Sequence, residues 1–99
     1  MERIIVQVDA DLEDLIPGYL QSRRQDVDSI LQALGKQDFE TIRVLGHTMK
    51  GTGGGYGFDA ITKMGRGFEE AAIDRNAQAI RQGAAALLDY LQAVKVVFK

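Results

Sequence analysis

The sequence contains no cysteine and no tryptophan, and it has one histidine and one proline in 99 residues. Without cysteine the chain has no disulfide framework, no cysteine-based zinc site and no thiol nucleophile. A single histidine also argues against a transition-metal site, because carboxylates would have to supply nearly all the ligands. We therefore expect neither a bound metal ion nor a cofactor.

A large excess of one sign of charge is also absent. The chain has 12 Lys and Arg against 14 Asp and Glu, which gives a formal net charge of −2. A nucleic-acid-binding domain needs a basic footprint, so this balance argues against nucleic acid as a partner. The apolar fraction of 45% and the charged fraction of 26% are ordinary for a globular chain. About 100 residues are enough for one domain with one core.

Long apolar runs are absent as well. No run approaches the ~20 residues that a membrane-spanning helix needs. The first ten residues lack the apolar core of a signal peptide, because Gln7 and Asp9 interrupt it. We expect a soluble, cytoplasmic protein without a membrane partner. The start methionine and a self-contained domain favour a standalone protein, and exposed polar faces predict a monomer.

Helical periodicity runs through most of the chain. Apolar residues recur at spacings of three and four, which predicts four amphipathic helices. The last of them, with Ile80, Leu87, Leu91 and Phe98 on one seam, is expected to run to the end of the chain. Short connections between such helices predict an all-α fold, an antiparallel up-down four-helix bundle.

Local signals mark several helix ends. Asp9 or Asp11 can cap a short leading helical turn, and Asp38 can cap the second long helix. Pro17 either breaks the leading turn or begins the first long helix. Gly35 is a plausible end for that helix.

Residues 3–9 do not follow the helical pattern. Ile4, Val6 and Val8 alternate with other residues, as in a short strand. No second convincing strand is present to pair with it, so we expect an extended arm that lies on the body. The expected organisation is an arm at residues 1–10 and a bundle at residues 11–99.

His47 and a glycine-rich run stand out from a generic bundle. Gly51-Thr52-Gly53-Gly54-Gly55-Tyr56-Gly57 follows His47 closely, with Lys50 between them. Each glycine costs up to ~1 kcal/mol inside a helix, so propensity alone ends the second helix near Lys50. The run could be a flexible loop, or it could allow the close approach of a neighbouring helix or a ligand.

The position of His47 on its helix suggests a chemical role. His47 is about 100° away from Gly46, which shares the apolar side with Ile42, so its imidazole should be at least partly exposed. Lys50 brings a cation to the same surface. Neutral imidazole is a good nucleophile near pH 7, and a cation can stabilise an incoming phosphoryl group. Glu69 could orient the ring through its other nitrogen.

Known nucleotide-binding motifs match the glycine-rich run poorly. Gly46 and Gly51 have the spacing of a phosphate-binding loop, but Thr52 occupies the lysine position and the preceding segment is helical. Gly55 and Gly57 nominally match a dinucleotide fingerprint, but no strand precedes them. An anion- or nucleotide-binding protein and a non-catalytic helical adaptor that docks signalling partners remain the alternatives to a phosphocarrier.

The segment His47-Thr48-Met49-Lys50-Gly51, followed by small residues and Gly57, resembles the H-x-x-K-G-x-x-x-x-x-G signature of histidine phosphotransfer (HPt) domains. The resemblance extends over residues 10–98. Thr52 and Gly53 depart from the small Ser/Ala pair that is common there, and the role of the triple glycine is open.

The resemblance implies a phosphorelay carrier of two-component signalling, which is not an enzyme in its own right. His47 would exchange a phosphoryl group with an aspartate of a receiver domain, in a response regulator or a hybrid histidine kinase. Lys50 would stabilise the phosphoryl charge, Gly51 would give the partner access and Gly57 would allow the turn. Magnesium would belong to the receiver, and the helix would continue through Gly51.

Surface features could assist docking. A basic fringe of Arg43, Lys50, Lys63 and Arg66 could complement the acidic pocket of a receiver. The apolar residues of the leading turn, Leu12, Leu15 and Ile16, could cover the end of the bundle or form part of a binding patch. We prefer the cover, because an exposed apolar patch is costly in a monomer.

Overall fold

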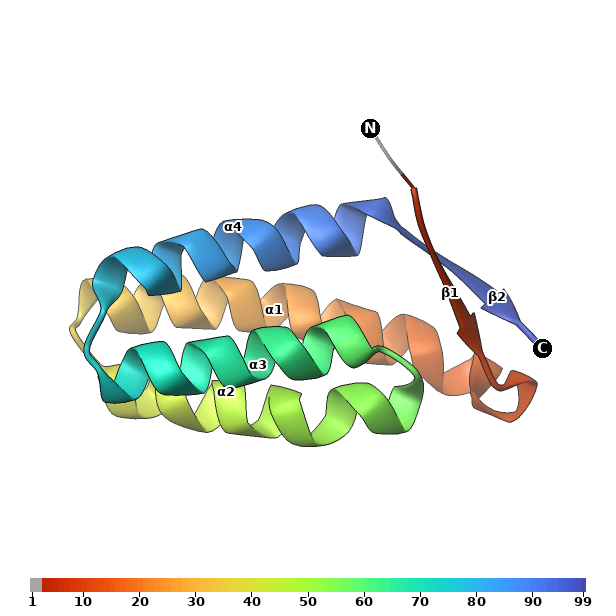
Figure 1. Ribbon diagram of the computed structural model, residues 1–99, viewed down its shortest axis with the longest axis horizontal. Coiled ribbons are helices and arrows are strands. Elements are labelled where there is room, and N and C mark those ends of the chain that lie inside the picture. Colours follow the sequence, from red (N-terminus) through yellow and green to blue (C-terminus); the bar gives the residue numbers. More distant parts are fainter. Residues whose placement is uncertain (1–2) are drawn as a thin grey trace.

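Four helices form the body of the molecule in the computed structural model, which describes residues 3–99 (Figure 1). They are α1 (Ile16–Gly35), α2 (Phe39–Gly53), α3 (Asp59–Ile73) and α4 (Ala77–Ala93). A short 3-10 helix, η1 (Ala10–Leu15), precedes α1, and another, η2 (Gly54–Tyr56), follows α2. In the described part of the chain, no helix is both long enough and apolar enough to cross a membrane.

Side-chain caps are present at the starts of η1 and α2, where the sequence predicts them. Asp38 accepts a hydrogen bond from the backbone N–H of Thr41 at 3.1 Å, which satisfies a free donor at the start of α2. Asp9 likewise accepts one from the N–H of Asp11 at 2.9 Å, and the turn that it caps is the 3-10 helix η1. Pro17 lies in the first turn of α1 and so begins that helix.

The connections place the helices side by side. The α1–α2 and α3–α4 connections lie at one end of the bundle, and the α2–α3 connection lies at the other end (Figure 1). The two connections at the first end each contain a non-glycine residue with positive φ, Gln37 at 57° and Arg75 at 54°. Such residues turn the chain sharply after a helix.

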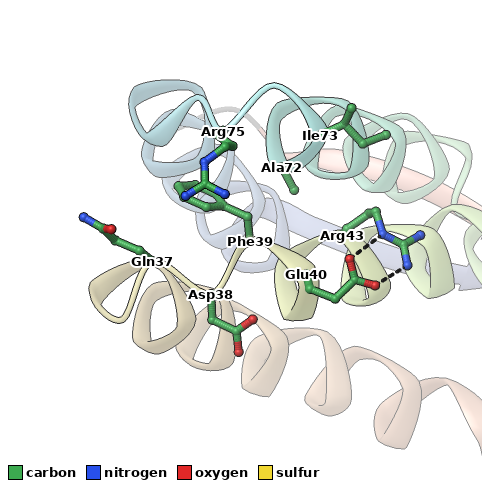
Figure 2. Close-up of a pocket in the computed structure, with 8 residues that line it drawn as sticks. All are labelled: Gln37, Asp38, Phe39, Glu40, Arg43, Ala72, Ile73 and Arg75. Carbon is green, nitrogen blue, oxygen red and sulfur yellow. Dashed lines mark hydrogen bonds and ion pairs between the residues drawn. The ribbon is translucent and has the colours of Figure 1, made fainter.

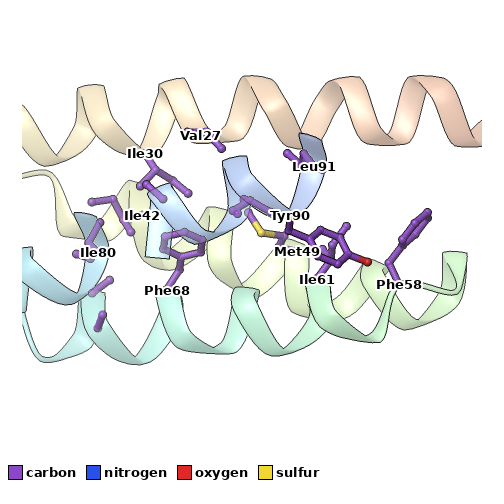
Figure 3. Packing of buried hydrophobic residues seen from close by; sticks show 14 of the residues in the cluster. Val27, Ile30, Ile42, Met49, Phe58, Ile61, Phe68, Ile80, Tyr90 and Leu91 are labelled. Carbon is purple, nitrogen blue, oxygen red and sulfur yellow. The ribbon is translucent and has the colours of Figure 1, made fainter. Parts of the chain in front are cut away.

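A continuous apolar core lies between the helices (Figure 3). Its centre holds Phe68, Met49 and Ile42, which are 0–2% exposed, and α4 contributes Ile80 and Leu87. Burial of a side chain of this size stabilises the fold by about 1.5–3 kcal/mol. The core therefore fixes which face of α2 points inward and which face is left for a site.

The two ends of the chain correct the sequence-based expectation. Residues 4–8 are a strand, β1 (Ile4–Val8), which pairs in parallel with β2 (Val94–Phe98) in a register that joins Val6 to Val96. The expected unpaired arm and the expected helix up to Phe98 are both wrong. The apolar spacing of three and four continues from α4 into β2, so it predicts helix there, although the Val-Lys-Val-Val run of β2 favours a strand. Residues 1–2 of the expected arm lie outside the described residues.

The strand pair is anchored to the body at the α2–α3 end. Val8 is 3% exposed and belongs to the core, and a Cβ added at Gly57 would lie 3.4 Å from its side chain. The backbone of Lys99 bonds both Val8 and Ala10. The sheet thus packs against the turn that follows α2.

Candidate functional site

Helices α2 and α3 approach each other backbone to backbone. A Cβ added at Gly46 would lie 2.7 Å from the carbonyl oxygen of Gly65 and from the backbone nitrogen of Glu69. A Cβ added at Gly65 would overlap the backbone nitrogen of Lys50. Glycine therefore removes the side chains that would hold the helices apart. This close packing brings side chains of α3 within reach of the exposed surface of α2.

The same packing explains how far α2 extends. The helix continues to Gly53, so the end near Lys50 that propensity predicts is wrong, and the continuation implied by the family resemblance is correct. A Cβ at Gly53 would lie 2.6 Å from the backbone nitrogen of Thr62, so glycine is needed there. Tertiary packing outweighs the helix cost of about 1 kcal/mol for such a residue.

The other glycines of the run have different surroundings. Added Cβ atoms at Gly51 and Gly55 would meet nothing within 4 Å, so the surface beside them is open. Gly57 follows η2 with a φ of 91°, in the left-handed region that favours glycine. The run is therefore a helix end, a 3-10 turn and a chain reversal, and not a loop throughout.

His47 lies on the outer face of α2, with 65% of its side chain exposed. Its Nδ1 atom is 2.9 Å from Oε2 of Glu69, which reaches across from α3. Glu69 itself is only 15% exposed. The sequence-based proposal that Glu69 could orient the histidine therefore has the necessary geometry.

Lys50 completes a three-residue cluster on the same carboxylate. Its Nζ donates a hydrogen bond to Oε1 of Glu69 at 2.6 Å, so each carboxylate oxygen faces one partner from α2. The hydrogen bond from Lys50, with that from His47, holds the pKa of the Glu69 carboxyl below its usual value of 4.5. Glu69 is therefore ionised at neutral pH.

The ionised carboxylate determines the histidine tautomer. A carboxylate can only accept hydrogen bonds, so the proton of a neutral His47 resides on Nδ1 and is donated to Glu69. The lone pair is then on Nε2. In this tautomer the ring presents Nε2 at an exposed position, with an ammonium group on the next turn of the same helix.

The expected basic fringe is only partly free. Arg43 donates from Nε to Oε2 of Glu40 at 3.0 Å. This pair lines an open hollow of about 480 Å³ between the start of α2 and the end of α3, at the end of the bundle with the α1–α2 and α3–α4 connections (Figure 2). Lys63 and Arg66 are exposed on α3. Arg43 is therefore already partnered within its own helix.

A second hollow, of about 440 Å³, lies on the other side of α2, between that helix and the start of α1. Thr48, the neighbour of His47, lines it together with Thr52, Leu15 and Tyr56. The leading apolar segment is divided between two environments, because Ile16 is 2% exposed whereas Leu15 is 54% exposed. Ile16 covers the bundle, and Leu15 borders the hollow.

Thr62, whose hydroxyl donates a hydrogen bond to the backbone carbonyl of Lys50 in α2, was not singled out from the sequence. The sequence contains one signal for it: Thr62 is three residues before Gly65 and seven before Glu69, so a helix places all three on the same face. Within residues 3–99, no group of three or more His, Cys, Asp or Glu side chains is arranged to hold a metal ion.

Comparison with protein families finds one model, described as Hpt domain, that matches residues 10–96. The matched range is most of the chain and contains His47, Lys50, Gly51, Gly57 and Glu69. Comparisons with curated proteins and with solved structures gave no match.

Proposed function

Because the chain belongs to the Hpt-domain family, whose members carry phosphoryl groups on histidine in two-component signalling, we propose that His47 is the phosphoryl-accepting residue. It exchanges the group with the aspartate of a receiver domain, in a response regulator or in a hybrid histidine kinase. The observation that carries this proposal is the contact of Glu69 with His47 and Lys50 at 2.9 and 2.6 Å.

The transfer uses the Nε2 lone pair of His47. Nε2 attacks the phosphorus atom of the receiver's aspartyl phosphate, a P–N bond forms and the P–O bond to the aspartate breaks. The electron pair of that bond leaves with the aspartate, which becomes a carboxylate. The proton stays on Nδ1 of His47, so the ring becomes cationic, and the ionised Glu69 at 2.9 Å stabilises this charge. The reverse sequence returns the group to the receiver.

Lys50 and Gly51 serve the incoming group and its carrier. The side chain of Lys50 is 32% exposed, so its ammonium can interact with phosphoryl oxygens while Glu69 anchors it. The open surface at Gly51, one turn from His47, admits the receiver without a side chain in the way. Gly57 reverses the chain so that α3 returns alongside α2 in an antiparallel up-down bundle.

The protein acts as a carrier without independent turnover. Each cycle begins and ends with a receiver aspartate, and the activating magnesium belongs to the receiver's acidic pocket. Exposed Lys63 and Arg66 on α3 attract this acidic partner. We expect the carrier to be a monomer, with Leu15 and the hollow beside Thr48 on the docking side.

The test is phosphoryl transfer from a panel of labelled phospho-receiver domains to the wild-type chain and to His47→Gln. We expect acid-labile, base-stable label on the wild type and none on the variant. The exposed position of His47 should leave the circular dichroism and the melting curve unchanged. A folded His47→Gln that accepts label equally well would refute the assignment. A wild type that no receiver labels would indicate the non-catalytic adaptor instead.

A further inference from the structure

Lys50 contacts one stripe of α3 at three different points. Its ammonium bonds Glu69, its backbone nitrogen lies directly against Gly65, and its carbonyl oxygen accepts a hydrogen bond from the hydroxyl of Thr62 at 3.1 Å. Residues 62, 65 and 69 follow one another at spacings of three and four, so they form a single line along the helix. Glu69 contacts only the end of the Lys50 side chain, whereas Thr62 and Gly65 contact the Lys50 backbone.

The hydroxyl of Thr62 is bonded on both sides. It donates to the carbonyl of Lys50 and accepts from the N–H of Gly54 at 2.8 Å. These two groups are four residues apart, which is the spacing of a donor and acceptor in an α-helix. Thr62 therefore binds the last turn of α2 at both ends. That turn carries Gly51 and directly follows Lys50.

Close packing leaves this turn little freedom. Gly53 has room for no Cβ, because the backbone nitrogen and the hydroxyl of Thr62 would be 2.6 and 2.7 Å away. The backbone of α2 therefore rests directly on Thr62. A change in the Thr62 contact would shift or rotate the turn at Lys50, which would alter the approach of its ammonium to Glu69.

We propose that Thr62 is a positioning residue for phosphoryl transfer. Its hydroxyl fixes the backbone of Lys50 so that the ammonium of Lys50 and the imidazole of His47 meet the same carboxylate. This inference rests on the proposed function for the transfer itself, but the alignment is a property of the unphosphorylated protein. It can therefore be tested without any receiver.

The first test compares Thr62→Val, which keeps the branched shape and lacks the hydroxyl, with Thr62→Ser, which keeps the hydroxyl. Thr41→Val is the matched control, because the Thr41 hydroxyl bonds Asp38 at the opposite end of α2. The readout is an NMR titration of the Glu69 side-chain carboxyl, which is faced by His47 and Lys50 and also lies near Arg43. We expect its pKa to rise toward the ordinary value in Thr62→Val only.

The second readout is the rate of transfer from a phospho-receiver that labels the wild type. We expect Thr62→Val to slow the transfer about fivefold, the effect of one ordinary hydrogen bond. Thr62→Ser should restore most of the rate, and Thr41→Val should keep it. A folded Thr62→Val with a wild-type Glu69 titration and a wild-type rate overturns the proposal. If no receiver labels the wild type, the proposed function fails, and the Glu69 titration still decides the alignment.

A measurement on the wild type covers the case in which Thr62→Val does not fold. The amide of Gly54 should exchange slowly with solvent deuterium, because the Thr62 hydroxyl binds it. The intrinsic exchange rate of an unprotected amide in the same sequence serves as the comparison. Exchange of Gly54 at that intrinsic rate shows that the Thr62 contact does not hold the turn, and it overturns the proposal.

Discussion

The Nδ1 atom of His47 lies 2.9 Å from Oε2 of Glu69, across a helix interface from which glycine has removed the intervening side chains. This relationship joins the packing of the bundle to the chemistry of the site. Because the ionised carboxylate accepts a hydrogen bond from Nδ1, the nucleophilic lone pair is left on Nε2. The exposed face of α2 can then present that nitrogen to a partner.

Replacing Glu69 should separate its two effects on His47. Glu69→Gln keeps an oxygen that accepts from Nδ1 but loses the charge, whereas Glu69→Ala loses both. We expect Glu69→Ala to slow phosphoryl transfer by about tenfold, the effect of losing one hydrogen bond to a charged group. Glu69→Gln should be impaired less. ¹⁵N NMR of the imidazole should show loss of the Nδ1–H tautomer in Glu69→Ala only, and equal tautomer populations in both variants would contradict the account.

The contribution of Glu69 to stability should depend on pH in a defined direction. Its folded-state pKa lies below its usual value of 4.5, because Lys50 and His47 bond the ionised form. The stabilisation is therefore fully present above pH 4.5 and is lost as the pH falls through the lowered pKa. Urea unfolding at a series of pH values should show Glu69→Gln less stable than the wild type at pH 7. The difference should shrink below pH 4.5, and a constant difference would contradict the pKa shift.

Two glycines of α3 offer a matched test of the close helix packing. A Cβ at Gly65 would overlap the backbone of Lys50, so Gly65→Ala should destabilise the protein by about 1–3 kcal/mol, as over-packing of a core does. Gly67 has nothing within 4 Å of an added Cβ, so Gly67→Ala should stabilise it by about 0.5–1 kcal/mol. Thermal or urea unfolding measures both. Equal effects would show that α2 and α3 do not touch at Gly65.

Gly51 should show opposite effects on stability and on transfer. An added Cβ meets nothing within 4 Å, so Gly51→Ala should raise the stability by about 0.5–1 kcal/mol through better helix propensity. A larger side chain in Gly51→Gln should slow transfer from a phospho-receiver, because it occupies the approach to His47. Gly67→Gln on α3 is the control for the same side chain. Unchanged transfer in Gly51→Gln would mean that the receiver does not dock over this position.

Much of the helical frame could be predicted because its signals are local. Asp38 caps α2, Asn76 lies in the turn before α4, and Pro17 begins α1, each for a reason that operates within a few residues. The strand pair could not be predicted in the same way. β1 carries a recognisable alternation, but its partner lies at the opposite end of the chain and shares the apolar spacing of α4.

The part of the site that lies on α2 could be predicted from the sequence. The spacing of His47, Lys50 and Gly51 places them on connected positions of α2, and Glu69 was a candidate because of its position at the edge of the core. The end of α2 at Gly53 depended on packing against Thr62, which no local propensity contains. Thr62 was overlooked for the same reason, since its importance lies in two bonds to another helix.

The most direct test of the account identifies the phosphorylated atom. The chain, labelled with ¹⁵N at its single histidine, is phosphorylated by a phospho-receiver and observed by ¹⁵N and ³¹P NMR. The account predicts phosphorus coupling at Nε2 of His47, with the proton retained on Nδ1 against Glu69. A phosphoryl group on Nδ1, or on a residue other than His47 in the folded protein, would contradict it.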